Sequence, residues 1–310
     1  MPTLHTLRPD RPNLHAHFSR DARPVLTVES GDSVSLSTPD VGWGLEPPTS
    51  TTAPRRKVEP RDPARDNGPC MVGPIAVNGA EPGDVLEVVI ERVRPCAWGW
   101  TYAGGSMVSA AYNRGLGIGD APLTLLRWTL DGDRRTTTSD KGDTVPVRAF
   151  MGTLGLSSDE AHASGWVPRV CGGNMDCPEL VEGSTLLLPV KVRGGLLSTG
   201  DGHAAQGEGE LSGTAIECAI EEVRLRLTVQ KRVSIAGPRI KTADGAWVTL
   251  GFGETLDLAA ERAVSGMLDV MVEETGRERA ELLALASARV SVRVTQMVNP
   301  LRGVHAVWRP

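Results

Sequence analysis

Eleven residues, 200–210, read GDGHAAQGEGE and concentrate side chains that can do chemistry. Asp201 and His203 are two positions apart, so on an extended segment both side chains point to the same side. Glu208 and Glu210 repeat this spacing. The glycines between them let the backbone bend closely around an ion or a small substrate, although the same composition is typical of a mobile surface loop.

Two further segments add polar groups that could join this one. Upstream, CGGNMDCPEL (171–180) carries Asn174 and Asp176, and downstream Glu217 begins an expected strand. One imidazole with two or three carboxylates can hold a divalent metal that polarises a carbonyl and acidifies a water. A separate carboxylate can then take the proton of that water and pass it to a leaving nitrogen.

Other interpretations of these residues stay open. An isolated Asp-x-His sequence is also typical of a turn with a hydrogen-bonded histidine. Cys171 and Cys177 flank the Asn174 segment, and either thiol could pair with a histidine as a nucleophile. A serine hydrolase is disfavoured because the chain has no Gly-x-Ser-x-Gly sequence.

Composition narrows the class of partner. The net charge of the 310 residues is −5 and the basic residues are scattered, which disfavours a nucleic-acid partner. No run approaches the ~20 apolar residues that cross a bilayer, and the first residues lack a secretory signal. The five cysteines form no C-x-x-C pair, which indicates reduced thiols. We therefore expect a cytoplasmic protein that binds neither nucleic acid nor membrane.

The elements that must position these side chains are mostly strands. Residues 24–38 contain two alternating apolar runs around Glu29–Asp32 and predict a hairpin. Period-two alternation predicts further strands at 83–95, 184–192, 215–232 and 288–298. Apolar residues recur every three or four positions over 255–275, which predicts a helix capped by Gly276, and a second helix follows at 277–287.

These patterns indicate an α+β fold that is predominantly β, with sandwich- or barrel-like sheets and a C-terminal helical pair packed on the β core. We expect a β-rich region over 1–232 that carries the candidate site, and an α+β region over 233–310 packed into the same globule. Residues 42–70 hold six prolines and predict a long surface loop or arm. Residues 96–120 also resemble a loop, and they contain Trp100.

Three segments, in this order and spacing, closely resemble the acetamidase/formamidase family: GPIAVNGAEPGDVLEVVIERV (73–93), GGNMDCPELVEGSTLLLPV (172–190) and LSTGDGHAAQGEGELSGTAIE (197–217). The opening segment 14–40 is similar to that family's first hairpin, with His15 at its histidine position. The resemblance implies hydrolysis of a short-chain amide such as acetamide or formamide to its carboxylate and ammonia. It also implies a β-rich fold, a homo-oligomer (a dimer or larger) and a divalent metal.

The family's polar positions fall on residues of this chain to which we assign roles as expectations. We expect a zinc ion, with calcium or another divalent ion as alternatives, held by His203, Asp201 and Asp176 and by Glu217 as a fourth ligand. Glu210 is expected to be the general base and then the acid. The remaining catalytic candidates are Asn174 and Gln206, and the substrate contacts expected are His15, Gly173 and Trp100.

Two other functions are compatible with the sequence. A metal hydrolase of another small C–N bond, in a cyclic amide, a urea-like compound or an amidine, would use the same groups. A non-catalytic β-domain of the same fold would be expected to lose the acidic and imidazole residues of 200–210, and here they are intact.

Overall fold

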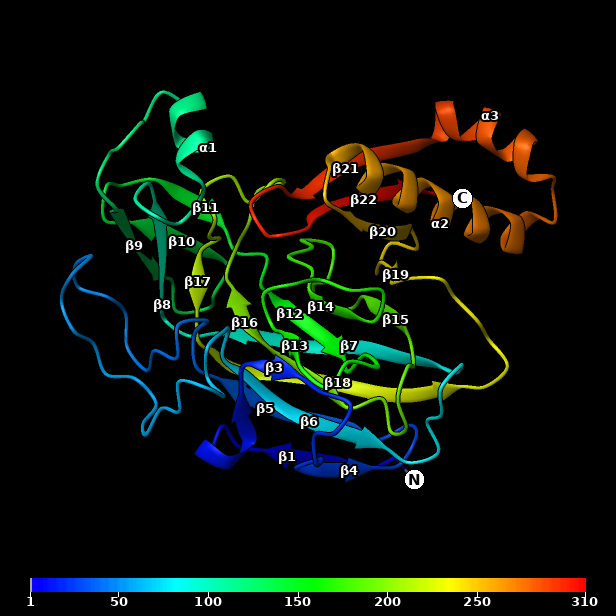
Figure 1. Ribbon diagram of the computed structural model, residues 1–310, viewed down its shortest axis with the longest axis horizontal. Coiled ribbons are helices and arrows are strands. Elements are labelled where there is room, and N and C mark those ends of the chain that lie inside the picture. The colour runs from blue at the N-terminus through cyan, green and yellow to red at the C-terminus, as the bar shows by residue number, and fades with distance from the viewer. Residues whose placement is uncertain (1) are drawn as a thin grey trace.

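The computed structural model describes residues 2–310 and contains two large open sheets (Figure 1). One sheet has nine strands, in the spatial order β1 (Leu4–Leu7), β5 (Ser33–Thr38), β18 (Ile220–Gln230), β7 (Val85–Pro95), β15 (Thr185–Pro189), β19 (Arg239–Lys241), β20 (Trp247–Gly253), β22 (Arg302–Trp308) and β21 (Val290–Gln296). The last four strands come from the C-terminal region, so the sheet runs without a break from the first residues of the chain to the last.

The second sheet has eleven strands and carries the candidate site. Eight follow one another in the order β11 (Thr144–Pro146), β10 (Thr136–Ser139), β9 (Thr124–Leu130), β8 (Trp98–Ala103), β17 (Glu217–Cys218), β16 (Leu197–His203), β12 (Phe150–Leu156) and β14 (Gly172–Asn174). The other three are β6 (Met71–Val77), which pairs with β16, and β2 (Leu14–His15) and β4 (Leu26–Val28), which pair with β6. A separate pair joins β3 (His17–Phe18) to β13 (Ala163–Ser164), and a 3-10 turn covers Arg11–Asn13.

The core lies where alternating apolar side chains of these sheets meet. In β18, Val223, Leu225 and Leu227 are fully buried, and Leu225 and Leu227 lie opposite Ile90 and Val88 of β7. Burying each such side chain stabilises the fold by about 1.5–3 kcal/mol. Period-two patterning therefore identified this strand correctly, because one of its faces is removed from water.

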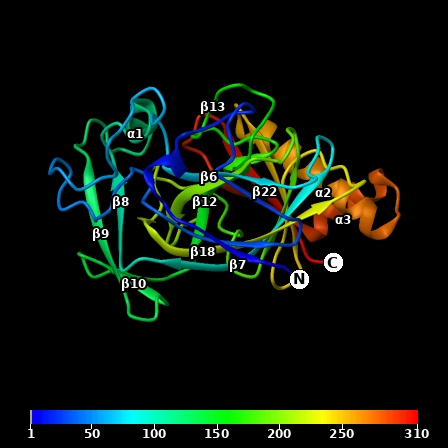
Figure 2. The same ribbon diagram turned by 90° about the horizontal axis from the view of Figure 1, so that it is seen from below.

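Helices cover only the C-terminal end of the molecule and one small extension at the other end (Figures 1 and 2). Helix α2 (Leu256–Thr275) begins at a Thr255 cap whose hydroxyl accepts from the Leu258 amide, and it ends at Gly276, with φ 68°. Helix α3 (Arg279–Arg289) packs on α2, and α2 packs on β20 and β22. A short helix α1 (Ala110–Gly115) lies beside the β8–β11 extension. No helix within residues 2–310 combines the length and apolar character that crossing a bilayer requires.

The predicted α+β fold, its β-rich core and its C-terminal helical pair are confirmed, but the hairpin at 24–38 was a wrong prediction. The chain does turn at Ser30 and Gly31, yet β4 pairs in parallel with β6, whereas β5 pairs with β1 and β18. The two strands thus enter different sheets. The loop expected over 96–120 also requires correction, since it contains strand β8 and helix α1.

Residues 42–70 form an irregular arm packed on the body of the protein. Their only ladder contact among the described residues is an isolated bridge between Gly44 and Lys57. Trp43 anchors the arm: its ring is buried, its indole N–H donates to the Gly68 carbonyl at 3.0 Å, and the Arg61 guanidinium lies 4.1 Å from the ring centroid. The prediction of a long arm is therefore confirmed.

Candidate active site

Five adjacent strands of the larger sheet, β14, β12, β16, β17 and β8, bring the functional side chains together by their register. Asn174 lies opposite Thr153, and His203 lies opposite Glu217, which in turn lies opposite Trp100. Neighbouring strands are about 4.8 Å apart, so these side chains converge from segments that are distant in sequence. The sheet thus brings together polar residues from all three segments singled out above, but Glu208 is exposed and pairs with Arg293 at 3.0 Å.

His203 is at the centre of a buried polar cluster. Its Nε2 lies 3.2 Å from Oδ1 of Asp201 and 3.3 Å from Oε2 of Glu217. The Phe150 ring meets the imidazole edge-on, with 5.0 Å between the ring centroids. All four residues are buried, so the imidazole is held by two carboxylates on one side and by an aromatic ring on another.

A second group of carboxylates contacts the same histidine. Asp176, His203 and Glu210 each offer a ligand atom within 4.8 Å of the others, as do Asp201, His203 and Glu217. His203 is therefore shared by two triplets. Asp176 and Asp201, which we expected to ligate one ion together with His203, fall in different triplets.

Gly152 of β12 forms the floor of the cluster. A Cβ atom at this position would lie 2.6 Å from Cε1 of His203 and 2.8 Å from both Oδ1 of Asp176 and Oδ2 of Asp201. Any side chain here would clash with all three groups. The absence of a side chain at Gly152 leaves the space in which these three residues meet.

The backbone at three of the site carboxylates is unusual. Asp176, Asp201 and Glu210 have positive φ angles of 49°, 59° and 49°. Non-glycine residues in this region cost of the order of 1 kcal/mol or more each, and such positions cluster at functional sites. In these three places the fold holds a carboxylate where a glycine would be less strained, which indicates that the side chains are required.

Burial sets the protonation of these groups. Burial and the charge of Asp201 raise the pKa of Asp176 to about 8. Burial raises the pKa of Glu217 to about 7, although His203 acts in the opposite direction. Burial and the charge of Asp176 raise the pKa of Glu210 well above its ordinary value. Burial alone would lower the pKa of His203, but Glu217 and Asp201 raise it instead.

Several atoms of the cluster lack any partner among residues 2–310: Oδ1 of Asp176, Oε2 of Glu210, and Nδ1 of His203, all of them buried. Four buried carboxylates face one imidazole, so at neutral pH the cluster either binds protons or binds a cation. Carboxylate oxygens and an imidazole nitrogen are a donor set that divalent metals accept. The residues present therefore fit a divalent cation.

Other side chains fix the orientation of these ligands. Asn174 accepts from the Thr153 hydroxyl at 2.6 Å and donates from Nδ2 to Oδ2 of Asp176 at 3.1 Å. Asn299, from the loop between β21 and β22, donates to the same Asp176 oxygen. The Ala215 amide donates to Oε1 of Glu217 at 2.9 Å. Such outer hydrogen bonds fix the direction in which a ligand presents its lone pairs.

A cavity of about 550 Å³ connects the cluster to the surface. Asn174, Asp201, Glu210 and Glu217 lie at its inner end, and residues 48–55 of the arm form part of its wall. Arg55 holds that wall in place, because its guanidinium pairs with the buried carboxylate of Asp40, which also accepts from the Trp100 indole at 2.8 Å. The arm therefore closes over the site within one subunit.

The sequence profile of the Acetamidase/Formamidase family matches residues 144–300 of this chain. This range contains nearly all of the cluster. The chain belongs to the acetamidase/formamidase family.

Solved structures in this family share the whole architecture. A predicted acetamidase/formamidase from Thermoanaerobacter tengcongensis superposes with a TM-score of 0.86 at 27% identity, covering 99% of this chain and 96% of that one. The acetamidase from Bacillus halodurans superposes with a TM-score of 0.83 at 27% identity, covering 97% of each chain.

The curated relatives match over a shorter stretch. The acetamidase of Mycolicibacterium smegmatis is 29% identical over 208 residues, which is 47% of this chain and 50% of that protein. The chain spans about half the length of the curated relatives it matches.

Three of the expected catalytic or substrate-binding residues lie outside both the carboxylate cluster and the cavity lining. His15, on strand β2, is half-buried and forms a hydrogen bond with Oγ of Ser198 at 3.0 Å. Gln206 donates from Nε2 to the Asp176 carbonyl at 2.8 Å, and so braces that residue from behind. Gly173 lies in β14 opposite Leu154. Their assignments as substrate contacts or catalytic groups stay predictions.

The geometry also bears on two groups near Asn174. The amide of Gly172, which precedes the expected substrate contact Gly173, already donates to the Arg169 carbonyl at 3.0 Å. Burial raises the pKa of Cys171 to about 11 and that of Cys177 to about 12, so both stay thiols at neutral pH. A cysteine nucleophile at these positions is therefore disfavoured.

Sequence reasoning missed Gly152, Thr153 and Asn299. Gly152 and Thr153 lie in the apolar run AFMGTLGL, where neither residue type draws attention. Asn299 precedes Pro300 in the segment VNPLRG, and an Asn-Pro pair is a turn signal at which a polar side chain can point back toward a neighbouring strand. Only this last residue carried a detectable signal.

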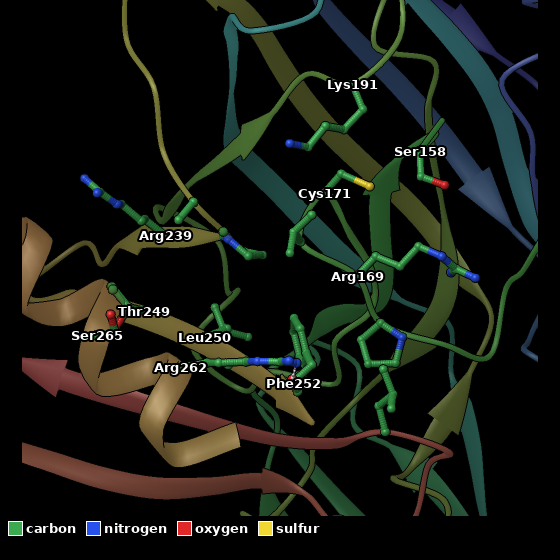
Figure 3. Close-up of a pocket in the computed structure, with 18 of the residues that line it drawn as sticks. Ser158, Arg169, Cys171, Lys191, Arg239, Thr249, Leu250, Phe252, Arg262 and Ser265 are labelled. Atoms are coloured by element: carbon green, nitrogen blue, oxygen red, sulfur yellow. Dashed lines mark hydrogen bonds between the residues drawn. The ribbon is translucent and has the colours of Figure 1, made fainter. Parts of the chain in front are cut away.

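A larger cavity, of about 900 Å³, lies elsewhere, between α2, β20 and the segment 158–171 (Figure 3). Its arginines already have partners: for example, Arg169 donates to Oε1 of Glu160 at 2.9 Å, and Arg262 donates to the Phe252 carbonyl. Lys191, at its rim, is exposed. This second cavity contains no member of the carboxylate cluster.

Proposed function

We propose that the protein hydrolyses a carboxylic amide to the carboxylate and ammonia with the help of a divalent cation held by the cluster. The observation that supports this most directly is the set of buried, partly unpartnered carboxylates around His203 at the inner end of a cavity. Membership of the acetamidase/formamidase family and the relatives named acetamidase or formamidase support the same reaction.

The candidate ligands are His203, which both triplets share, with Asp201, Asp176 and Glu217; we propose that Glu210, the remaining member, transfers the proton instead of holding the ion. When bound, a divalent cation supplies Lewis acidity, which polarises a carbonyl and acidifies a water. Asp201 and Glu217 contact Nε2 of His203, and Asp176 offers a carboxylate oxygen within 4.8 Å of a nitrogen of the same imidazole. Zinc suits a mixed imidazole and carboxylate set, and we propose it ahead of calcium or another divalent ion.

Glu210 is the residue that we propose moves the proton. Its Oε2 is buried and has no partner in the described chain, and the residue lines the cavity. Burial raises its pKa, so that it holds a proton more readily than an ordinary carboxyl, as a group that delivers a proton to the leaving nitrogen must. It accepts a proton from the attacking water and delivers one to the nitrogen as the C–N bond breaks.

Asn174 and Thr153 keep the neighbouring groups in position. Because the Asn174 amide accepts from Thr153 and donates to Asp176, its orientation is fixed before a substrate arrives. A preorganised polar group loses little free energy to reorganisation during the reaction. We also propose that the protein acts as a cytoplasmic homo-oligomer, which size-exclusion chromatography with light scattering can measure.

Elemental analysis of the purified protein, together with an assay of ammonia release from acetamide and formamide, tests this function. We expect about one divalent ion per chain, and loss of activity on chelation that the same ion restores. Glu210→Gln should keep the ion and lose turnover. A protein that holds no divalent ion and releases ammonia at the same rate with and without chelator would contradict the proposal.

A further inference from the structure

The cavity at the cluster is much larger than a short-chain amide. If each non-hydrogen atom takes about the volume of a water, ~30 Å³, the four heavy atoms of acetamide fill only about a fifth of the 550 Å³. Cavities of about 300–1,000 Å³ are the size that encloses drug-sized ligands. The space beyond the carboxylates therefore has room for a larger acyl group.

The wall of this space is unusually aromatic for this chain. Trp100, Tyr102 and Trp166 line it, although the whole sequence has only seven tryptophans, two tyrosines and three phenylalanines. The rings of Trp100 and Tyr102 have centroids 4.8 Å apart at 48°. Trp166 comes from the separate segment between β12 and β14 and is 41% exposed. Aromatic surface from two parts of the fold thus faces one cavity.

These aromatic residues differ in whether their side chains already have polar partners in the protein. The Trp100 indole donates to the buried Asp40, and the Arg55 guanidinium lies 5.4 Å from its ring centroid. Within residues 2–310, by contrast, the Tyr102 hydroxyl and the Trp166 indole have no side-chain hydrogen bond; both residues bond through their backbone only. Tyr102 and Trp166 are therefore free to contact a ligand with ring face and polar tip.

The charges around the cavity favour an uncharged ligand. Arg55 is neutralised by Asp40, so it does not call for an anionic group, and Lys57, the other cation of the lining, is exposed to solvent. At the inner end, Asp201, Glu210 and Glu217 would repel a carboxylate carried by the substrate. An uncharged ring needs no cationic partner, and these carboxylates do not repel it.

We propose that the site takes primary amides whose acyl part carries an uncharged aromatic ring, with the amide at the carboxylate cluster and the ring against Tyr102 and Trp166. This inference rests on the proposed amide hydrolysis. In the reaction the C–N bond breaks and a C–O bond to the oxygen of water forms. The products are an arylalkyl carboxylate and ammonium, and no oxidant or reductant is needed.

The test compares kcat/KM for 2-phenylacetamide and acetamide, both measured by ammonia release. We expect wild-type protein to prefer 2-phenylacetamide by about tenfold or more, since one added methylene alone can change discrimination by about 10–200-fold. Trp166→Ala should reduce that preference about two- to tenfold, the range of an aromatic pair.

Val170→Ala is the matched control. Val170 lies in the same segment, is 49% exposed and lines only the second cavity, so its truncation should leave the preference within about twofold of wild type. A wild-type preference for acetamide, or equal loss with both amides in Trp166→Ala, would overturn the proposal while the amidase function stands.

If neither amide is hydrolysed, the proposed function fails and the ring site is decided by binding. Isothermal titration with 2-phenylacetamide should then show binding to wild type and Val170→Ala, and weaker binding to Trp166→Ala. No detectable binding to wild type, or equal binding to all three proteins, would overturn it.

Discussion

Two cavities of this protein show that the volume of a cavity and the presence of unpartnered polar groups in it are separate properties. The larger, of about 900 Å³, is bordered by arginines that already have acceptors, such as Arg239, which pairs with Glu273. The smaller, of about 550 Å³, ends at buried carboxylates with unpartnered oxygens and left-handed backbone. Unsatisfied polar groups that a fold keeps buried at a cost indicate a functional site better than volume does.

The largest expected effect is on the rate of amide hydrolysis, which should depend on the carboxylate cluster and not on the second cavity. His203→Ala removes the group that both triplets share, and it should lower amide hydrolysis about 10³-fold, at the upper end for loss of one electrostatic group. The bound divalent ion should fall in parallel. Lys191→Ala, at the second cavity, should change activity less than about twofold. Equal losses in both variants would remove the distinction between the cavities.

A substitution at Gly152, the floor of the cluster, should also lower the rate of amide hydrolysis, whereas a substitution far from the cluster should not. Gly152→Ala places a methyl group within 2.8 Å of two site carboxylate oxygens, so the ligands must move. Displacement by about 1 Å can cost roughly 10²-fold in rate, and we expect a loss of this size with reduced metal content. Gly115→Ala, which meets nothing within 4 Å, is the control and should keep full activity. A Gly152→Ala enzyme with normal rate would show that the cluster can relax.

Each cavity has an arginine that forms an ion pair with a carboxylate. Removing each arginine compares how much the two ion pairs stabilise the fold. Arg55→Met leaves the buried Asp40 with the Trp100 and Gly44 donors alone, and it should lower the free energy of unfolding by about 3 kcal/mol. Arg239→Met leaves only the exposed Glu273, so the cost should be about 1 kcal/mol or less. Urea unfolding measures both values. The reverse order would mean that the wall of the second cavity is the more tightly built.

The smallest effect concerns a histidine outside both cavities. Burial lowers the pKa of His15 to about 4, whereas the unfolded chain has its usual 6.5, so below pH 6.5 the unfolded state binds more protons. Its contribution is complete above pH 6.5 and is lost as the pH falls toward 4. Between pH 7.5 and 5 the loss is about 2 kcal/mol.

His15→Gln should flatten this pH dependence of the unfolding free energy while activity at pH 7.5 changes little. Unfolding in urea at several pH values provides the measurement. A steep loss of turnover in His15→Gln would instead favour the substrate contact that the sequence led us to expect.

The sequence predicted those features that depend on residues close together in the chain. Helix α2 followed from apolar residues on one stripe and from Gly276, whose positive φ ends the helix. The polar segment 200–210 was found because aspartate, histidine and glutamate carry a chemical signal in any context. In both cases the residues that make the feature are neighbours in sequence.

What the sequence could not show depends on partners that are distant in the chain. The turn at Gly31 is real, but the choice of β6 for β4 and of β18 for β5 is made by the core. Gly152 gave no signal, since a glycine in an apolar run acquires its role only when β16 places Asp201 beside it. The second triplet likewise depends on how the Glu210 loop folds back.

The irregular arm that forms one side of the active-site cavity has a consequence for how such proteins diversify. Asp201, His203 and Glu217 lie on strands that the sheet register fixes, whereas residues 48–55 of the wall belong to no strand or helix. Insertions and deletions are tolerated best in segments of this kind. Lengthening or exchanging this stretch can therefore change which molecules enter the cavity while the sheet keeps Asp201, His203 and Glu217 in place.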